Sequence, residues 1–392
     1  MPGPTGKGVR MRAHAVLEAL AALHAVTCLV VPLWDPRGAH DVPAETSRIA
    51  EVVVAPPPAA YAVHRRLLAQ AWYRRLAARA AARVAPWPLE SIGIPATIGS
   101  RRLAGRRFRR VHAFRLCTAP FAAPFLVGAR LSIDLDDLEG DKQRRIALLP
   151  ATAPAVRRAF EADAVLSDLV LARWRARADV LLVASEQDRA RLERAGGARI
   201  LVAPNVVRAP AIAPPLPSAS PHRILFVGGL DYAPNRDAVA WLVREIVPAL
   251  ARHDAPSWEL HLVGTGGHSL LAELGVHDAR VIAHDTVPDV TPHLARARAV
   301  VVPLRAGGGT RIKVLEALAH ARPVVSTTLG AEGLELQGGR HLLIGDDAAT
   351  IAGHLATLLR DGDLATRLGM AGRARVAAAY SPEALARALA DL

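Results

Sequence analysis

The chain has 392 residues, of which 51% are hydrophobic and 22% are charged, and its formal net charge is +13. This composition excludes a disordered protein, and one core rarely spans so long a chain, so two globular domains are expected. The cysteines, Cys28 and Cys117, are too few for a disulfide framework and lack partners at zinc-ligand spacing. A reducing compartment, and therefore a cytoplasmic location, fits this cysteine usage.

The positive charge raises the question of a nucleic-acid partner, but most of the excess lies in one region. Between Tyr61 and Arg110 the sequence holds twelve arginines, no lysine and a single acid, Glu90. No recognised nucleic-acid-binding module accompanies these arginines, so we expect no nucleic-acid partner. Arginines beside Trp72 would suit peripheral contact with an anionic membrane, whereas a biased genome explains the same composition without any partner.

Short apolar runs alternate with longer helical patterns along the first half. The predicted strands are 27–33, 51–55, 110–115, 131–135, 179–184 and 199–203. The predicted helices are 12–24, 62–83 and 155–177. These strands are rich in Val, Leu and Ile without polar alternation, which is typical of a parallel sheet covered by helices.

The start of the chain departs from this pattern. Met1 is followed at once by Pro-Gly-Pro-Thr-Gly-Lys-Gly and then by a helical pattern. A doubly wound domain normally opens with a strand near the centre of its sheet, so the first strand of this domain is expected to be missing. The apolar stretch 13–33 is interrupted by His14, Glu18 and His24, so it predicts a helix and a strand rather than a secretory signal or a membrane span.

Five prolines between 206 and 222 predict a hinge, because neither a helix nor a central strand tolerates them. Beyond it the predicted strands are 223–227, 259–263, 280–283, 299–303 and 323–326. The predicted helices are 236–252, 269–274, 289–297, 311–321, 348–360, 364–379 and 382–390. We therefore predict two Rossmann-like, doubly wound α/β domains, 1–205 and 223–392, with a cleft between them and the last helix packing back on the first domain.

The segment most typical of ligand binding runs from Val300 to Ala319. A buried strand enters a turn of three glycines, Gly307 to Gly309, which opens directly into a helix. Glycines let the backbone approach a ligand, and the free N–H groups of a helix start attract anions. Thr310 can cap this helix, and Arg311 and Lys313 add cations where a diphosphate would lie, while Glu316 can accept hydrogen bonds from ribose hydroxyls. The alternative is an ordinary glycine turn with Lys313 and Glu316 as an exposed ion pair.

Together with the segments given below, these residues make the second half resemble the donor domain of a family of retaining glycosyltransferases, family 4, also called glycosyl transferases group 1. Members of this family have the two-Rossmann (GT-B) architecture. Besides the glycine-rich segment, the matching segments follow the order of the family. They are Phe226-Val-Gly-Gly-Leu, Pro234-Asn-Arg-Asp-Ala, Leu262-Val-Gly-Thr-Gly, Val287-Pro-Asp-Val, Arg322-Pro-Val-Val-Ser-Thr, Gly330-Ala-Glu-Gly-Leu and His341-Leu-Leu-Ile.

The resemblance implies a nucleotide-diphosphate sugar as donor, transfer with retention at the anomeric carbon, and neither a metal nor another cofactor. Glu316 matches the second of the paired glutamates of the family, the one near the ribose, whereas Gly308 stands in place of the first. The loss of that carboxylate leaves the identity of the sugar open. The turn containing Gly229, with Arg236 nearby, matches a phosphate-binding part of the family, although its usual Arg–Lys pair is altered here.

The first half resembles the acceptor domain of the same family less closely. Thr5-Gly-Lys-Gly-Val-Arg matches a glycine loop that faces the donor phosphates, which implies roles for Gly6, Lys7 and Gly8. Val111-His-Ala-Phe-Arg-Leu resembles the fourth strand with Arg115 in its exit loop. In Ile133-Asp-Leu-Asp-Asp-Leu-Glu, Asp136 and Asp137 stand where many relatives have a histidine and an acid.

A carboxylate at a strand end can orient the acceptor hydroxyl or take its proton, which makes Asp136 and Asp137 the candidate catalytic residues. The alternative is a solvated acidic turn that pairs with Lys142, Arg144 and Arg145. The sequence thus predicts a glycosyltransferase that acts on a glycan or a lipid-linked acceptor, as in bacterial polysaccharide biosynthesis. A nucleotide-sugar epimerase of the same fold and a non-catalytic sugar-nucleotide or glycan-binding protein stay as alternatives.

Overall fold

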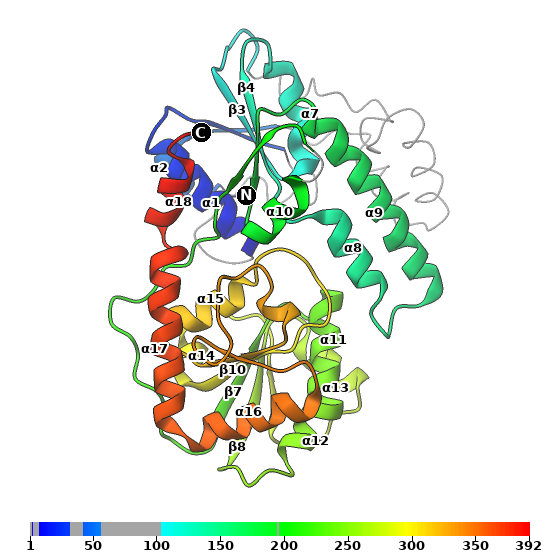
Figure 1. Cartoon of the computed structure of the whole chain (residues 1–392), viewed down its shortest axis with the longest axis vertical. Helices are drawn as coiled ribbons and strands as arrows, with labels where there is room; N and C mark the ends of the chain where they lie inside the picture. The colour runs from blue at the N-terminus through cyan, green and yellow to red at the C-terminus, as the bar shows by residue number, and fades with distance from the viewer. Residues whose placement is uncertain (1, 3–7, 32–41, 56–102, 194–195) are drawn as a thin grey trace. The chain divides into compact units, whose positions relative to one another are not determined.

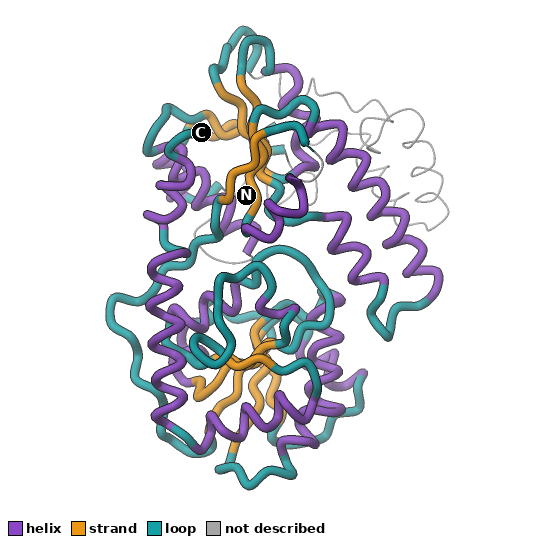
Figure 2. Tube along the Cα trace, viewed as in Figure 1, coloured by secondary structure: helices purple, strands orange, loops and turns teal. Residues whose placement is uncertain are grey.

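The computed structural model describes residues 2, 8–31, 42–55, 103–193 and 196–392. They form two compact α/β units, each built of parallel strands with helices around them (Figures 1 and 2). Unit 1 comprises Met1–Leu148, Thr152–Val206 and Pro382–Leu392, and unit 2 comprises Leu149–Ala151 and Val207–Ser381. The predicted helix 62–83, with the arginines considered for membrane contact, lies outside the described residues, as do Gly6 and Lys7.

Unit 1 contains two parallel sheets, and its strands match the predicted ones to within a few residues. The smaller sheet pairs β1 (Thr27–Val30) with β2 (Glu51–Val54). The larger sheet has the order β3-β4-β5-β6, with bounds Arg110–Phe114, Arg130–Asp134, Val180–Val183 and Arg199–Val202. In a doubly wound sheet the first strand lies between the second and the fourth. Among the described residues, β1 and β3 belong to separate sheets, so no described strand joins them at that place.

The helices of unit 1 bury their apolar faces against the larger sheet and against each other. Their bounds are α1 (Gly8–Ala21), α2 (Ala44–Ile49), α7 (Ala119–Ala122), α8 (Glu139–Ala147), α9 (Pro154–Arg175), α10 (Glu186–Glu193) and α18 (Pro382–Leu389), with 3-10 turns η1 (Leu116–Thr118) and η2 (Ala123–Phe125) on either side of α7. Trp174 of α9 is buried with Ile133 of β4 and Leu181 of β5. At the end of the chain, Leu385 and Leu389 of α18 pack with Val16 of α1, so α18 belongs to this unit.

Unit 2 is built around one parallel sheet with the strand order β12-β11-β10-β7-β8-β9. The bounds in chain order are β7 (His222–Val227), β8 (Trp258–Val263), β9 (Val281–His284), β10 (Ala297–Val302), β11 (Val324–Ser326) and β12 (Leu343–Ile344). The chain first adds strands on one side of β7 and then crosses back to add β10 on the other side. The strand order therefore reverses between β7 and β10, at what is called a topological switch point.

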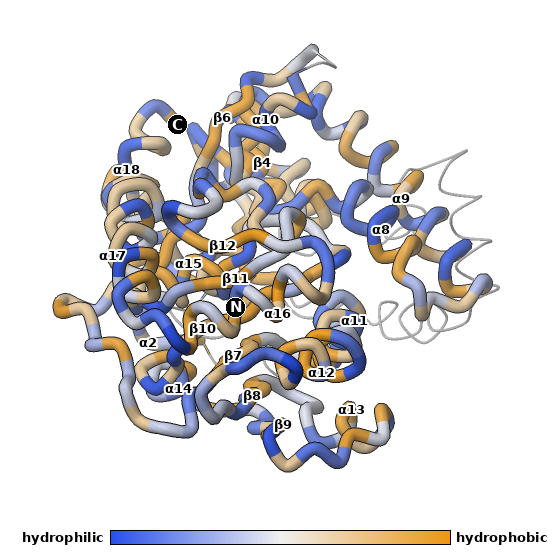
Figure 3. Tube along the Cα trace, turned by 60° about the horizontal axis from the view of Figure 1, so that its bottom comes forward, coloured by the Kyte–Doolittle hydropathy of each residue, from blue (hydrophilic) through white to orange (hydrophobic). Residues whose placement is uncertain are grey.

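Helices surround this sheet and close its core. They are α11 (Ala233–Trp241), η3 (Leu242–Ile246), α12 (Val247–Leu250), α13 (Gly267–Glu273), α14 (Thr291–Arg296), α15 (Ile312–Ala319), η4 (Leu329–Ala331), α16 (Ala348–Arg360) and α17 (Gly362–Ala379). Every residue of β10 is buried, and apart from Arg298 the strand consists of Ala and Val, which Figure 3 colours as hydrophobic. Among the described helices, none combines the length and the apolar character that a bilayer crossing requires.

Candidate functional site

Two glycine-containing turns meet at the switch point of unit 2. Gly228 and Gly229 follow β7 directly, and the glycines 307–309 lie a few residues after β10. In open parallel α/β sheets, ligands bind outside the carboxyl ends of the strands at the place where the strand order reverses. The topology therefore selects, independently of any motif, the same two segments that the sequence selects.

The backbone at these turns has conformations and spacings that favour glycine. Gly307 has φ 119° and Gly309 has φ 65°, both in the left-handed region. A Cβ on Gly228 would lie 2.6 Å from Lys313 Nζ, and a Cβ on Gly264, after β8, would collide with the carbonyl oxygen of Gly228. Side chains at these places would push the turns apart, so their absence lets polar groups of different elements converge.

The helix α15 begins one residue later than a cap at Thr310 requires. Arg311 is the N-cap residue and α15 has no side-chain cap, so the prediction that Thr310 caps the helix is wrong. The backbone carbonyl of Thr310 accepts a bond from Ile312 N instead. Its side-chain Oγ1 is buried and finds no hydrogen-bond partner among the described residues. A buried hydroxyl in this state is unusual in a native fold, and it offers a donor to a ligand at the helix start.

Two cations lie beside that hydroxyl. Arg311 is only 6% exposed, and its guanidinium donates to the carbonyl of Gly309. Lys313 reaches from α15 to β7, where its Nζ lies 4.5 Å from the centroid of the Phe226 ring and 2.8 Å from Asn235 Oδ1. Burial, with a smaller contribution from the charge of Arg311, lowers the pKa of Lys313 to about 7.

Glu316 lies one turn further along α15 and is half-buried, as Lys313 is. Burial raises the pKa of Glu316 to about 7, although the nearby charge of Lys313 opposes this shift. Because Lys313 bonds to Asn235 and both side chains are partly buried, the alternative of an exposed Lys313–Glu316 ion pair is wrong. A helix start with a buried ammonium, a buried guanidinium and an unsatisfied hydroxyl is suited to an anion such as a pyrophosphate.

The structure directs Arg236 away from these groups. Its guanidinium forms 2.7 Å bonds to both carboxylate oxygens of Glu273 on α13. The neighbouring residues of α11, Asn235 and Asp237, are buried instead, and each bonds to a side chain of the segment 300–319. Asp237 accepts bonds of 2.9 and 2.7 Å from Arg305, the residue that leads into the glycine turn. The sequence did not point to Asn235 or Asp237 as site residues, although both belong to the Pro234-Asn-Arg-Asp-Ala segment that carries the resemblance.

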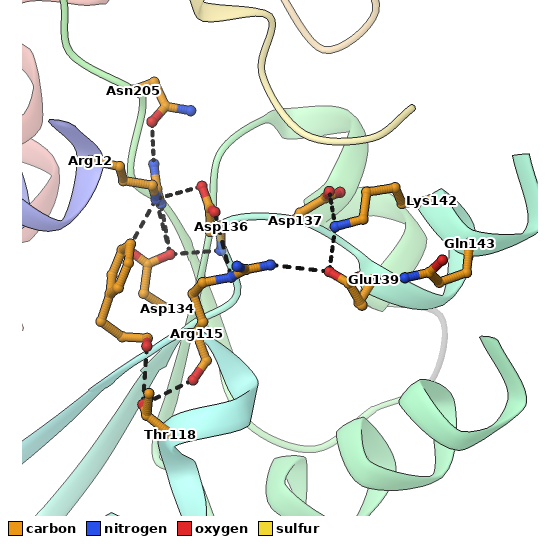
Figure 4. A network of polar contacts seen from close by, with 11 residues as sticks. Arg12, Arg115, Thr118, Asp134, Asp136, Asp137, Glu139, Lys142, Gln143 and Asn205 are labelled. Carbon is orange, nitrogen blue, oxygen red and sulfur yellow. Dashed lines mark hydrogen bonds and ion pairs between the residues drawn. The ribbon is translucent and has the colours of Figure 1, made fainter. Parts of the chain in front are cut away.

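In unit 1 the predicted acidic turn forms a network around a buried arginine that the sequence did not point to (Figure 4). Arg12 of α1 is 2% exposed, and its Nη2 lies 2.9 Å from Asp134 Oδ1 at the end of β4. Its Nη1 donates to the carbonyl of Ala203 at 2.9 Å and to Asn205 Oδ1 at 3.3 Å. Gly8 is the first residue of α1, so this part of the predicted glycine loop is helical.

Asp136 lies in the same network with an unusual backbone conformation. Its φ is 57°, its N–H donates to Asp134 Oδ1 at 2.8 Å, and its own carboxylate lies 3.8 Å from Arg12 Nε. Burial raises the pKa of Asp136 to about 6, and the charge of Arg12 only partly opposes it. Arg115, at the exit of β3, also has a positive φ, 68°, and its Nε lies 3.8 Å from Asp136. Such backbone strain at the ends of adjacent strands is typical of functional sites.

Asp137 has a different environment from Asp136. It pairs with Lys142 Nζ at 3.2 Å, and Glu139, the first residue of α8, pairs with the same ammonium at 2.5 Å. The alternative of an acidic turn neutralised by its own helix therefore describes Asp137 and Glu139 but not Asp136. Among the described residues, no three His, Cys, Asp or Glu side chains form a group that could hold a metal ion.

Comparison with known proteins agrees with this geometry. Residues 221–361 match the family model of the glycosyl transferases group 1. An uncharacterized 44.6 kDa protein in the cps region of Klebsiella pneumoniae is 26% identical over 139 residues, which is 34% of this chain and 36% of that protein. The aligned part therefore spans about a third of the length of this curated relative.

Solved glycosyltransferase structures resemble the whole chain. Sucrose-phosphate synthase from Thermosynechococcus elongatus has a TM-score of 0.69 at 19% identity, covering 98% of this chain and 92% of its own. HepE from Anabaena, solved in complex with UDP and glucose, has a TM-score of 0.61 at 14% identity, covering 100% of this chain and 96% of its own. The apo form of the lipopolysaccharide outer core galactosyltransferase WaaB has a TM-score of 0.58 at 14% identity, with the same coverage.

These likenesses define the class of protein: the chain has the GT-B fold of two Rossmann-like units. Residues 221–361, the part that carries the glycine-rich segment, match the glycosyl transferases group 1.

Proposed function

We propose that the chain is a retaining, metal-independent glycosyltransferase that uses a nucleotide-diphosphate sugar. Unit 2 binds the donor, with the pyrophosphate at the glycine turn 307–309 and the start of α15. Thr310 Oγ1, Arg311 and Lys313 face the phosphates, and Glu316 accepts hydrogen bonds from the ribose. The observation that carries the proposal is the convergence of buried cations and an unsatisfied hydroxyl on the switch point of the sheet.

By stabilising the leaving diphosphate, these groups would do the work that a metal ion does in metal-dependent enzymes. As the bond between the anomeric carbon and the diphosphate breaks, negative charge develops on the phosphate oxygens, and preorganised positive groups lower the energy of that state. Attack by the acceptor hydroxyl on the face from which the diphosphate leaves gives retention of configuration. The proposal assigns these cationic roles to Arg311 and Lys313.

Unit 1 carries the acceptor in this proposal. Asp136, whose pKa of about 6 lets it be ionised at neutral pH, orients the acceptor hydroxyl and takes its proton. Arg115 and Arg12 fix the position of that carboxylate. We propose a glycan or a lipid-linked glycan as acceptor, in polysaccharide biosynthesis. The relative from a cps region and the likeness to a lipopolysaccharide core galactosyltransferase support this choice.

The donor site is tested by screening nucleotide-diphosphate sugars for thermal stabilisation and then titrating the best one by calorimetry. Arg311→Gln and Lys313→Met should each weaken its affinity by on the order of tenfold or more, because each removes a charge-assisted bond to phosphate. Arg280→Gln is the matched control, since Arg280 pairs with Asp278 just before β9, at the opposite end of the sheet. Unchanged affinity in both site variants would refute the proposal.

Product analysis distinguishes a glycosyltransferase from the two alternatives, a nucleotide-sugar epimerase and a non-catalytic binding protein. A new glycosidic bond on an acceptor, with the anomeric configuration of the donor, is the expected result. Release of an epimerised sugar nucleotide without an acceptor would identify an epimerase instead. Donor binding without turnover across a panel of glycan and lipid-linked acceptors would identify a binding protein.

A further inference from the structure

Asn235, in the first turn of α11, uses its whole amide to connect two parts of unit 2. The side chain is 7% exposed. Its Oδ1 accepts a 2.8 Å bond from Lys313 Nζ, and its Nδ2 donates a 2.8 Å bond to the carbonyl of Gly229. Because a lysine ammonium can only donate, the amide oxygen must face it. One side chain thus ties the ammonium carried by α15 to the turn after β7.

The space around Lys313 Nζ leaves this ammonium few other directions. The Phe226 ring lies 4.5 Å away, and a Cβ at Gly228 would lie 2.6 Å from Nζ and 2.7 Å from Asn235 Nδ2. The bare backbone of Gly228 is therefore what allows the amide and the ammonium to approach the turn. A free lysine side chain populates many rotamers, and an anion would otherwise have to overcome that entropy when it orders the ammonium.

We propose that Asn235 is a positioning residue of the donor site: it holds Lys313 Nζ at the turn after β7, where the ammonium meets the pyrophosphate. The inference rests on the proposed function of the glycine turn and of α15. Asn235 itself does not touch the phosphates in this account. It acts through Lys313, by fixing the ammonium before the ligand arrives, which lowers the cost of binding.

The two bonds of Asn235 can be separated by substitution. Asn235→Ala removes both, whereas Asn235→Asp keeps an acceptor for Lys313 and loses the donor to Gly229. The new carboxylate also favours the charged form of Lys313. Because that carboxylate would also repel a diphosphate, nucleotide affinity is measured in Asn235→Ala, and Asn235→Asp is compared with it by melting temperature. A purely structural link between α11 and the turn would be lost in both variants.

The test is a double-mutant cycle with UDP as the probe, or with whichever of ADP, CDP, GDP and dTDP binds tightest if UDP does not bind. Affinities are measured by calorimetry for the wild type, Asn235→Ala, Lys313→Met and the double variant, with melting temperatures to confirm folding. Asn235→Ala should weaken binding by about tenfold in the wild type, as expected for the loss of a bond to a charged group. In the Lys313→Met background, Asn235→Ala should weaken binding by less than about twofold, because no ammonium remains there for Asn235 to position.

The outcomes separate this inference from the proposed function. Equal weakening by Asn235→Ala in both backgrounds would show a structural role and overturn the inference. An unchanged affinity in Asn235→Ala would overturn it as well. If Lys313→Met leaves the affinity unchanged, the ammonium does not meet the pyrophosphate and the inference fails, whereas the phosphate site itself is refuted only if Arg311→Gln has no effect either.

Discussion

Lys313 is the residue whose titration reports most directly on the proposed site. With its pKa lowered to about 7, the ammonium is half-protonated at neutral pH in the free protein. A bound pyrophosphate favours the protonated form, so its binding must raise this pKa and take up protons. The affinity for a sugar nucleotide, whose phosphates do not titrate near neutral pH, should therefore fall as the pH rises through about 7.

This prediction is best measured in the Glu316→Gln variant, because Glu316 titrates in the same range and the two groups interact. Calorimetry between pH 6 and pH 9 should show affinity falling up to tenfold per unit on the alkaline side, with proton uptake near pH 8. Adding Lys313→Met should remove both the slope and the uptake. A slope that survives the loss of Lys313 would assign the titration to another group.

Asp136 should govern the acid side of the activity. A carboxylate that orients a hydroxyl or takes its proton must be ionised, so the rate should fall as the pH drops below its pKa of about 6. Asp136→Asn should lower kcat by about a hundredfold, which is the usual scale of one general base, and should leave donor affinity unchanged.

Asp137→Asn is the matched control, because Asp137 pairs with Lys142 in the next helix and its loss should change kcat much less. Steady-state rates across pH 5–8 would check both variants. Equal losses of kcat in the two variants, or an acid limb that persists in Asp136→Asn, would argue against the assignment.

At the scale of elements, apolar patterning predicted most of the fold and failed where a pattern is short or polar. The helix α16 has the predicted bounds, and β10 is buried along its length as predicted. The helices α8 and α10 were missed, since their residues are mostly charged and each buries only a few side chains. The two-residue strand β12 is too short to carry any periodicity.

In the candidate site, too, residues close together in the sequence were easier to predict than residues that meet only in the fold. The glycines, the cations and Glu316 of the predicted site lie within one segment, so spacing along the chain was enough to group them. Arg12 was missed because it pairs with Asp134, which is 122 positions away in the sequence. The sequence pointed to Arg236 and not to Asn235 because the direction of a side chain depends on where α11 sits against the sheet. Charge alone favoured the arginine, which pairs at the surface with Glu273.

At the scale of the whole molecule, the proposed donor-binding groups all belong to unit 2, whereas the Asp136 network belongs to unit 1. Nucleotide binding should therefore stabilise the two units unequally. A ligand at 100 times its Kd stabilises the binding-competent state by about 2.7 kcal/mol, which slows the openings that destroy the site by about a hundredfold. Hydrogen–deuterium exchange should show this protection in β7, β10 and α15.

The segments α1 and α18 of unit 1 serve as the internal reference for this experiment, because they pack on each other and contain none of the proposed donor-binding residues. The bare nucleoside, which has no phosphates, should protect none of these elements if the pyrophosphate supplies the main contacts. The diphosphate and the sugar nucleotide should protect unit 2 alike. Protection confined to unit 1, around β4 and α8, would place the nucleotide at the acidic network and reverse the assignment of donor and acceptor units.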